Sequence, residues 1–125
     1  MSLFLSPIYM PHTMTKESPV MQQCIKDCRE CERVCKETMA HCLKMGGKHA
    51  EQEHIGSLKD CVETCKLSAD FMERDSHLSP NACKLCAEAC DRCADSCESV
   101  DPNDSKMKSC AEVCRRCVES CRKMA

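Results

Sequence analysis

The stretch CKLCAEACDRCADSC, from Cys83 to Cys97, decides the fold. Its cysteines recur at steps of three, four, three and four residues. At about 100° per residue, five side chains with this spacing stay within roughly 80° of one another around an α-helix. The segment is therefore predicted to be a helix that carries one face of thiols.

Cysteines with the same helical spacing occur as stripes in three other parts of the chain, at 24–42, 61–65 and 110–121. All 16 cysteines of the chain fall on these four stripes. The sequence thus predicts four helices whose inward faces are made of sulfur. The cysteines are Cys24, Cys28, Cys31, Cys35, Cys42, Cys61, Cys65, Cys83, Cys86, Cys90, Cys93, Cys97, Cys110, Cys114, Cys117 and Cys121.

The composition indicates one small domain with few ordinary core residues. The chain has 125 residues, 2% aromatic residues and no tryptophan, so cysteine is expected to serve as the small hydrophobic residue of the core. With 18 Lys and Arg against 20 Asp and Glu, the net charge is −2. This balance provides no basic field for nucleic acid, and no apolar run is long enough to cross a membrane.

High cysteine density also fits a secreted, disulfide-bonded scaffold, but the start of the chain argues against secretion. Residues 1–10 lack a basic region and a small-residue cleavage pattern, and Pro7 interrupts them. We therefore expect a cytoplasmic protein with reduced thiols, a setting in which clustered cysteines indicate metal binding.

Local signals divide the chain into a tail and four helices. Residues 1–17 show no periodicity and are expected to form an irregular tail, whereas residues 18–125 are expected to form the domain. Ser18 and Ser79, each followed by proline, are predicted N-caps. Because the connections are short, we predict an all-α fold, an antiparallel up-down-up-down four-helix bundle with a Cys-lined core. The expected helices run over 19–45, 50–74, 80 to about 100, and 105–123.

This topology assigns inward-facing residues to the two ends of the bundle. One end is expected to collect Met39, Cys42, His54, Cys97, Met107 and Cys110. The opposite end is expected to collect Met21, Cys24, Met72, Cys83 and Cys121. His12, His41, His49 and His77 are expected to face solvent.

Seven separate Cys-x3-Cys pairs suggest the chemistry of the core. On a helix, residues four apart have Cβ atoms about 5–6 Å apart, whereas a disulfide needs roughly 3.5–4.5 Å. A linear ion bound by two thiolates at about 2.3 Å each separates the sulfurs by about 4.6 Å, which such a pair can span. Soft thiolates in linear pairs suit Cu(I). Zinc knuckles, ferredoxin-type spacing and a thioredoxin-like βαβ pattern fit this sequence less well.

With these stripes on four helices, residues 18–124 resemble the bacterial copper storage proteins, and in particular their cytosolic branch. The resemblance implies a non-enzymatic protein that stores many Cu(I) ions in a four-helix bundle and forms homotetramers. It also implies His and Met ligands where copper enters, here His54, Met39 and Met107, beside the 16 cysteines. Two alternatives stay open: a general thiolate buffer for zinc or cadmium, and a structural bundle whose cysteines are redox-active or cross-linked.

Overall fold

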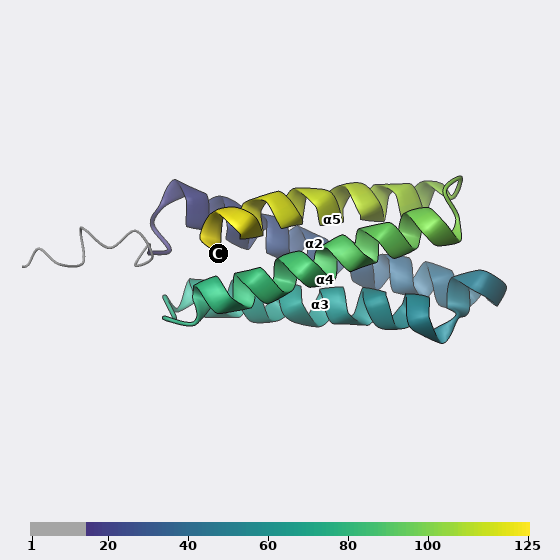
Figure 1. Ribbon diagram of the computed structural model, residues 1–125, viewed down its shortest axis with the longest axis horizontal. Coiled ribbons are helices and arrows are strands. Elements are labelled where there is room, and N and C mark those ends of the chain that lie inside the picture. The colour runs from purple at the N-terminus through teal and green to yellow at the C-terminus, as the bar shows by residue number, and fades with distance from the viewer. Residues whose placement is uncertain (1–14) are drawn as a thin grey trace, which may run out of the picture.

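The computed structural model describes residues 15–125, which form four long helices and one short one (Figure 1). No strand occurs within this range. The tail predicted for residues 1–17 lies largely outside the described residues, as does His12, so the division into tail and domain stays a prediction. The helices are α2 (Pro19–Met45), η2 (Gly47–Ala50, a 3₁₀ helix), α3 (Gln52–Glu73), α4 (Ser79–Val100) and α5 (Ser105–Met124).

The four long helices form a closed antiparallel ring. Helices α2 and α4 each pack against both α3 and α5, and successive helices run in opposite directions (Figure 1). The C-terminus accordingly lies at the end of the bundle where α2 begins (Figure 1). The up-down-up-down four-helix bundle predicted from the sequence is confirmed.

Capping residues explain where two of the helices begin. Ser18 is the N-cap of α2 and its hydroxyl accepts a hydrogen bond from the Met21 amide, while Pro19 takes the first helical position. Asp104 caps α5 by accepting from the amides of Lys106 and Met107. Both helices therefore start at residues whose side chains or ring geometry suit a helix terminus.

The predicted cap of α4 is wrong by one residue. Ser79 is the first residue of the helix and Leu78 is the N-cap. The reason lies in the preceding turn, where the Ser76 hydroxyl accepts from the Leu78 amide and the Ser76 carbonyl accepts from the Ser79 amide. These bonds hold the chain so that Ser79 enters the helix, and its own buried hydroxyl has no partner.

The connection between α2 and α3 also differs from the prediction. Gly46 and Gly47 have φ values of 71° and 56°, a left-handed conformation that favours glycine and ends α2. The chain then forms η2 over Gly47–Ala50, so α3 begins at Gln52 instead of residue 50 and ends at Glu73 instead of residue 74. Helix α5 extends one residue beyond its predicted end, to Met124.

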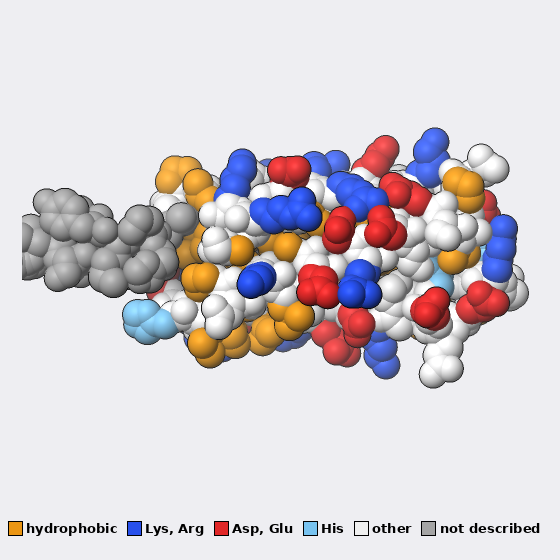
Figure 2. Space-filling model, viewed as in Figure 1, with side chains coloured by type: hydrophobic (Ala, Val, Ile, Leu, Met, Phe, Trp, Pro, Cys, Tyr) orange, Lys and Arg blue, Asp and Glu red, His pale blue; other side chains and the backbone are white. Residues whose placement is uncertain are grey.

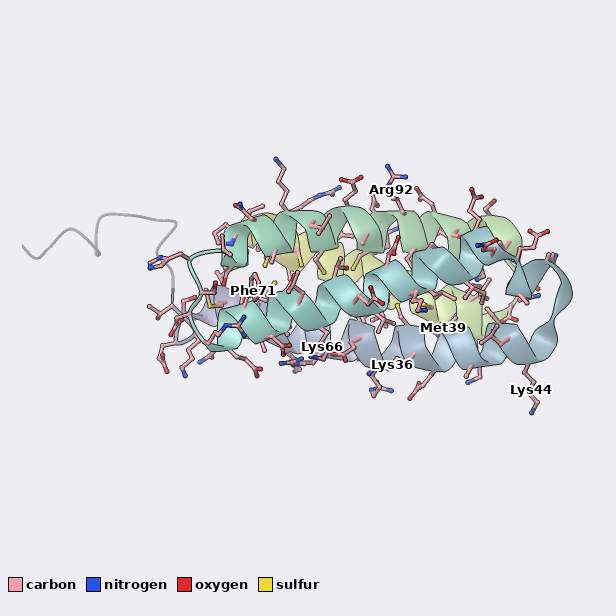
Figure 3. All side chains as sticks on the ribbon, turned by 90° about the horizontal axis from the view of Figure 1, so that it is seen from below. Lys36, Met39, Lys44, Lys66, Phe71 and Arg92 are labelled. Atoms are coloured by element: carbon pink, nitrogen blue, oxygen red, sulfur yellow. The ribbon has the colours of Figure 1, made fainter. Side chains whose placement is uncertain are left out.

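The core consists largely of thiols, and the surface is charged. All 16 cysteines have 0% exposure, together with Leu58, Met72 and Met107. Lys36, Lys44, Lys66 and Arg92 point away from the bundle (Figure 3), and charges of both signs are interspersed on the face in Figure 2. This separation agrees with the stripe pattern in the sequence.

Candidate metal centre

The sulfur atoms form a continuous network through the middle of the bundle. Cys61 illustrates its density, because its Sγ lies 3.3 Å from that of Cys90 and 3.6 Å from those of Cys31 and Cys35. These three neighbours belong to α2 and α4, so the network crosses between helices. Thiols that lie far apart in the sequence are thus close enough to bind the same metal ion.

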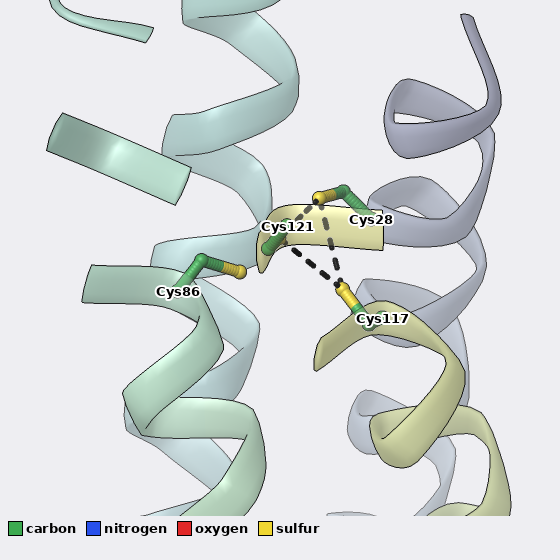
Figure 4. Close-up of side chains that lie close together, drawn as sticks. All are labelled: Cys28, Cys86, Cys117 and Cys121. Atoms are coloured by element: carbon green, nitrogen blue, oxygen red, sulfur yellow. Dashed lines mark hydrogen bonds between the residues drawn. The ribbon is translucent and has the colours of Figure 1, made fainter. Parts of the chain in front are cut away.

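The network contains groups of four thiols whose sulfurs all lie within 4.8 Å of one another. Successive groups share members, so an ion in one group would have a ligand in common with an ion in the next. Figure 4 shows the first of them, with Cys28 on α2, Cys86 on α4 and Cys117 and Cys121 on α5. The groups include Cys28/Cys86/Cys117/Cys121, Cys65/Cys86/Cys90/Cys117, Cys31/Cys61/Cys65/Cys90, Cys31/Cys35/Cys61/Cys114 and Cys35/Cys93/Cys110/Cys114.

Helix α3 contributes only two cysteines, yet it closes the sulfur wall at the centre of the bundle. Cys65 Sγ lies 3.6 Å from Cys86 Sγ and 3.9 Å from Cys117 Sγ. Together with Cys61, it connects the groups at the two halves of the core. Although α3 carries only two cysteines, the network of thiols is therefore continuous through the middle of the bundle.

The distances within single helices are shorter than the sequence argument required. The Sγ atoms of Cys31 and Cys35 lie 3.9 Å apart, and those of Cys86 and Cys90 3.8 Å apart. A linear thiolate pair needs about 4.6 Å, whereas thiolates that share a trigonal or tetrahedral ion at about 2.3 Å lie roughly 3.8–4.0 Å apart. The side chains turn toward each other because they pack in a tight core. As they stand, the sites suit three or four thiolates per ion, and linear pairs need a small side-chain rotation.

Burial disfavours the charged, thiolate form of the core cysteines. Hydrogen bonds with neighbouring thiols, in addition to burial, raise the pKa of Cys65, Cys90 and Cys114 well above the usual range. Such hydrogen bonds lower the pKa of other members of the network, namely Cys24, Cys31, Cys61, Cys86 and Cys110. Burial, followed by the charges of Asp104 and nearby thiols, raises the pKa of Cys42 to about 11. A metal ion that binds these residues must therefore displace protons.

Cys42 differs from the other thiols because its sulfur contacts an imidazole and a thioether. Its Sγ lies 3.4 Å from His54 Nε2 and 3.5 Å from Met107 Sδ. His54 Nδ1 lies 2.7 Å from Ser96 Oγ, and burial lowers the pKa of the imidazole. A neutral imidazole with its proton on Nδ1 would leave the Nε2 lone pair facing Cys42, which suits a soft metal ligand.

This end of the core is approached through a groove. The groove has a volume of about 890 Å³ and lies between α3 and α4, with His54 and Ser96 in its lining. His54 and Met107 themselves are 2% and 0% exposed, so they lie below the surface. Met39 is half-buried and packs against the edge of the core. At the opposite end, Met72 is buried with its Sδ 3.7 Å from Cys83 Sγ, which agrees with the predicted layout, and Met21 is also buried.

Comparison with known proteins identifies the family. The sequence profile described as "Csp: Copper storage protein" matches residues 17–125. The chain belongs to the copper storage protein family.

Solved structures agree with this membership. The Nmul_A1745 protein from Nitrosospira multiformis is similar with a TM-score of 0.79 and 44% identity, over 85% of this chain and 94% of that one. The Cu(I)-bound copper storage protein BsCsp3 is similar with a TM-score of 0.78 and 30% identity, over 85% of this chain and 98% of that one.

A curated relative is the uncharacterized cysteine-rich protein YhjQ of Bacillus subtilis (strain 168), which is 31% identical over 67 residues. This match spans 54% of the present chain and 62% of that protein.

Three polar residues at the His54 end of the bundle could not be recognised as part of the site from the sequence: Ser96, His49 and His41. Ser96, which orients His54, lies beside a cysteine on α4, and nothing in its spacing distinguishes it from a solvated serine. His49 and His41 were expected to face solvent, but His49 is 5% exposed and His41 is half-buried. The turn at Gly46 and Gly47 folds His49 back against the bundle, which the helix periodicity could not reveal.

The expectation about membranes is consistent with the described helices. Within residues 15–125, no helix combines the length and the apolar character that a membrane span requires.

Proposed function

We propose that this protein stores Cu(I) in its thiol core, as a metal reservoir and not as a catalyst. The observation that carries the proposal is the continuous column of four-thiol groups that share members. All 16 cysteines are completely buried and unpaired by disulfides. A structural zinc site needs only four ligands, so a column of this extent favours storage of many ions.

Three arguments favour Cu(I) as the stored ion. Thiolates are soft ligands, which suit Cu(I). If the thiols rotate slightly so that each ion bridges two thiolates and each thiolate bridges two ions, about sixteen monovalent ions balance sixteen thiolates, and the buried core remains neutral. Family membership and the similarity to a Cu(I)-bound copper storage protein support the same choice.

The proposed ligands are the 16 cysteines, with His54, Met107 and Met39 at the end where copper enters. Imidazole and thioether are neutral and bind more weakly than a pair of thiolates, so they can pass an ion inward without trapping it. The groove beside His54 supports an approach from this end. A cytoplasmic location and a homotetrameric assembly complete the proposal and rest on the resemblance to the cytosolic branch of the family.

Anaerobic titration with Cu(I) and with Zn(II), each against a competing chelator, tests the proposal. We expect Cu(I) to fill the core and to displace Zn(II) completely. Preferential retention of Zn(II) would instead support a general thiolate buffer. Counting free thiols on freshly purified protein tests the alternative of a structural bundle with cross-linked cysteines. Such a bundle would show far fewer than sixteen free thiols.

A further inference from the structure

A second group of metal-binding side chains lies outside the thiol core, at the end of the bundle that holds Cys42. It consists of His41 from α2, His49 from η2, and Asp101 and Asp104 from the turn between α4 and α5. The connection that contains η2 and the α4–α5 turn lie at the same end of the bundle (Figure 1). Three separate segments therefore converge on this cluster.

The four side chains approach each other through the atoms that bind metals. Asp104 Oδ2 lies 2.7 Å from His41 Nε2 and 3.5 Å from His49 Nε2, and Asp101 Oδ2 lies 3.1 Å from His49 Nε2. Ligands of a tetrahedral ion with bonds of about 2.0–2.2 Å lie roughly 3.3–3.6 Å apart. Two of the three distances are close to this value, and an ion would need to open the closest pair by less than about 1 Å.

Helix capping alone does not account for the arrangement. Asp104 uses Oδ1 to cap α5, since this oxygen accepts from the amides of Lys106 and Met107. Its other oxygen, Oδ2, faces the two imidazoles. The carboxylate thus has one oxygen free of the capping role and directed into the cluster.

His49 supplies an independent observation that points to a ligand. Its side chain is 6% exposed, and its Nε2 atom is buried without a hydrogen bond although carboxylate oxygens of Asp101 and Asp104 lie 3.1 and 3.5 Å from it. A buried polar atom without a partner destabilises the fold. A bound cation would give this nitrogen the partner that the protein does not.

We propose that His41, His49, Asp101 and Asp104 form a site for a divalent transition-metal ion such as Zn²⁺, separate from the Cu(I) core. Two imidazoles and two carboxylates are ligands that Zn²⁺ accepts, whereas thiolates are absent from this cluster. An ion held here would tie η2 to the α4–α5 turn beside Cys42. The site goes beyond the proposed storage function and does not depend on it.

The test measures Zn²⁺ bound to Cu(I)-loaded protein by equilibrium dialysis and metal analysis. Copper occupies the thiols, so additional Zn²⁺ reports the second site. We expect one Zn²⁺ per chain in the parent and in the control His77→Gln, whose imidazole is exposed. The double variant His49→Gln with Asp101→Asn should bind at least about 100-fold more weakly, because it loses two ligands. Mg²⁺, which prefers an oxygen octahedron, should not compete.

Two further measurements keep the result decisive. Asp101→Asn alone, which retains the side-chain oxygen that accepts from the Asn103 amide, should weaken binding at least about tenfold if the double variant does not fold. Co²⁺ in place of Zn²⁺ gives an intense sulfur-to-metal charge-transfer band only when thiolates bind it, so the second site is recognised even if copper loading fails. A parent protein that binds no additional Zn²⁺, or a double variant that binds as tightly as the parent, would overturn the proposal.

Discussion

Replacement of His54 by Ala and Met107 by Leu tests where copper enters the core. These are the two side chains in contact with the Cys42 sulfur, at 3.4 and 3.5 Å, whereas at the opposite end Cys83 contacts a thioether, Met72 Sδ at 3.7 Å. By ligand counting, the double variant should lose at most about one of sixteen ions. A copper ion that leaves through this end would lose its two weaker ligands, so we expect removal to slow at least about tenfold, which corresponds to about 1.4 kcal/mol on the barrier.

The assay follows the rate at which an excess of Cu(I) chelator strips the fully loaded protein. Leucine fills the volume of Met107, and the cost to stability should stay below about 1.5 kcal/mol at that position. The loss of the His54 ring leaves Ser96 without its partner and should cost about 1–3 kcal/mol, so circular dichroism must first verify folding. The matched control, Met21→Leu with Met72→Leu, changes the opposite end. Copper does not enter at the His54 end if the double variant exchanges copper as fast as the parent, or if the control variant slows exchange instead.

Three other predictions concern protons, folding and charge. Because burial disfavours thiolates in the metal-free core, each Cu(I) should release about one proton, which titration in weak buffer would detect; an absence of proton release would contradict this argument. Because these thiols already pack as small hydrophobic residues, the metal-free protein should retain its helical circular dichroism, and a random-coil spectrum would refute this account. Hydrogen bonds from Lys66 and Arg29 lower the pKa of Asp70, so the native carboxylate stabilises the fold above the unfolded-state pKa of about 3.9. The stability advantage over Asp70→Asn in urea unfolding should therefore be present at pH 7 and disappear as pH falls below about 4, and an advantage that persists at pH 2 would contradict it.

The bundle and its sulfur core were predictable from sequence because both follow from periodicity. The steps of three and four residues between Cys83 and Cys97 require a helix, and the short connections require antiparallel neighbours. The same layout correctly placed Cys42, His54 and Met107 together, since inward-facing residues at the ends of adjacent helices must meet.

The predictions failed where a turn decides which way a side chain points. Ser79 is not a cap because Ser76 forms the bonds of the preceding turn, and His49 is buried because two glycines reverse the chain before it. The distances between sulfur atoms also could not be predicted from the residue spacing alone. They depend on the side-chain conformations in the packed core, where the Cys31 and Cys35 sulfurs lie 3.9 Å apart.

The copper content of anaerobically loaded protein tests the storage proposal most directly. The protein is reduced, saturated with Cu(I), separated from unbound metal and analysed for copper per chain. Shared thiolates in a neutral core predict about sixteen ions, or one for each cysteine. Saturation below about eight ions per chain would contradict a core filled with Cu(I), because it would leave most of the thiol column without metal.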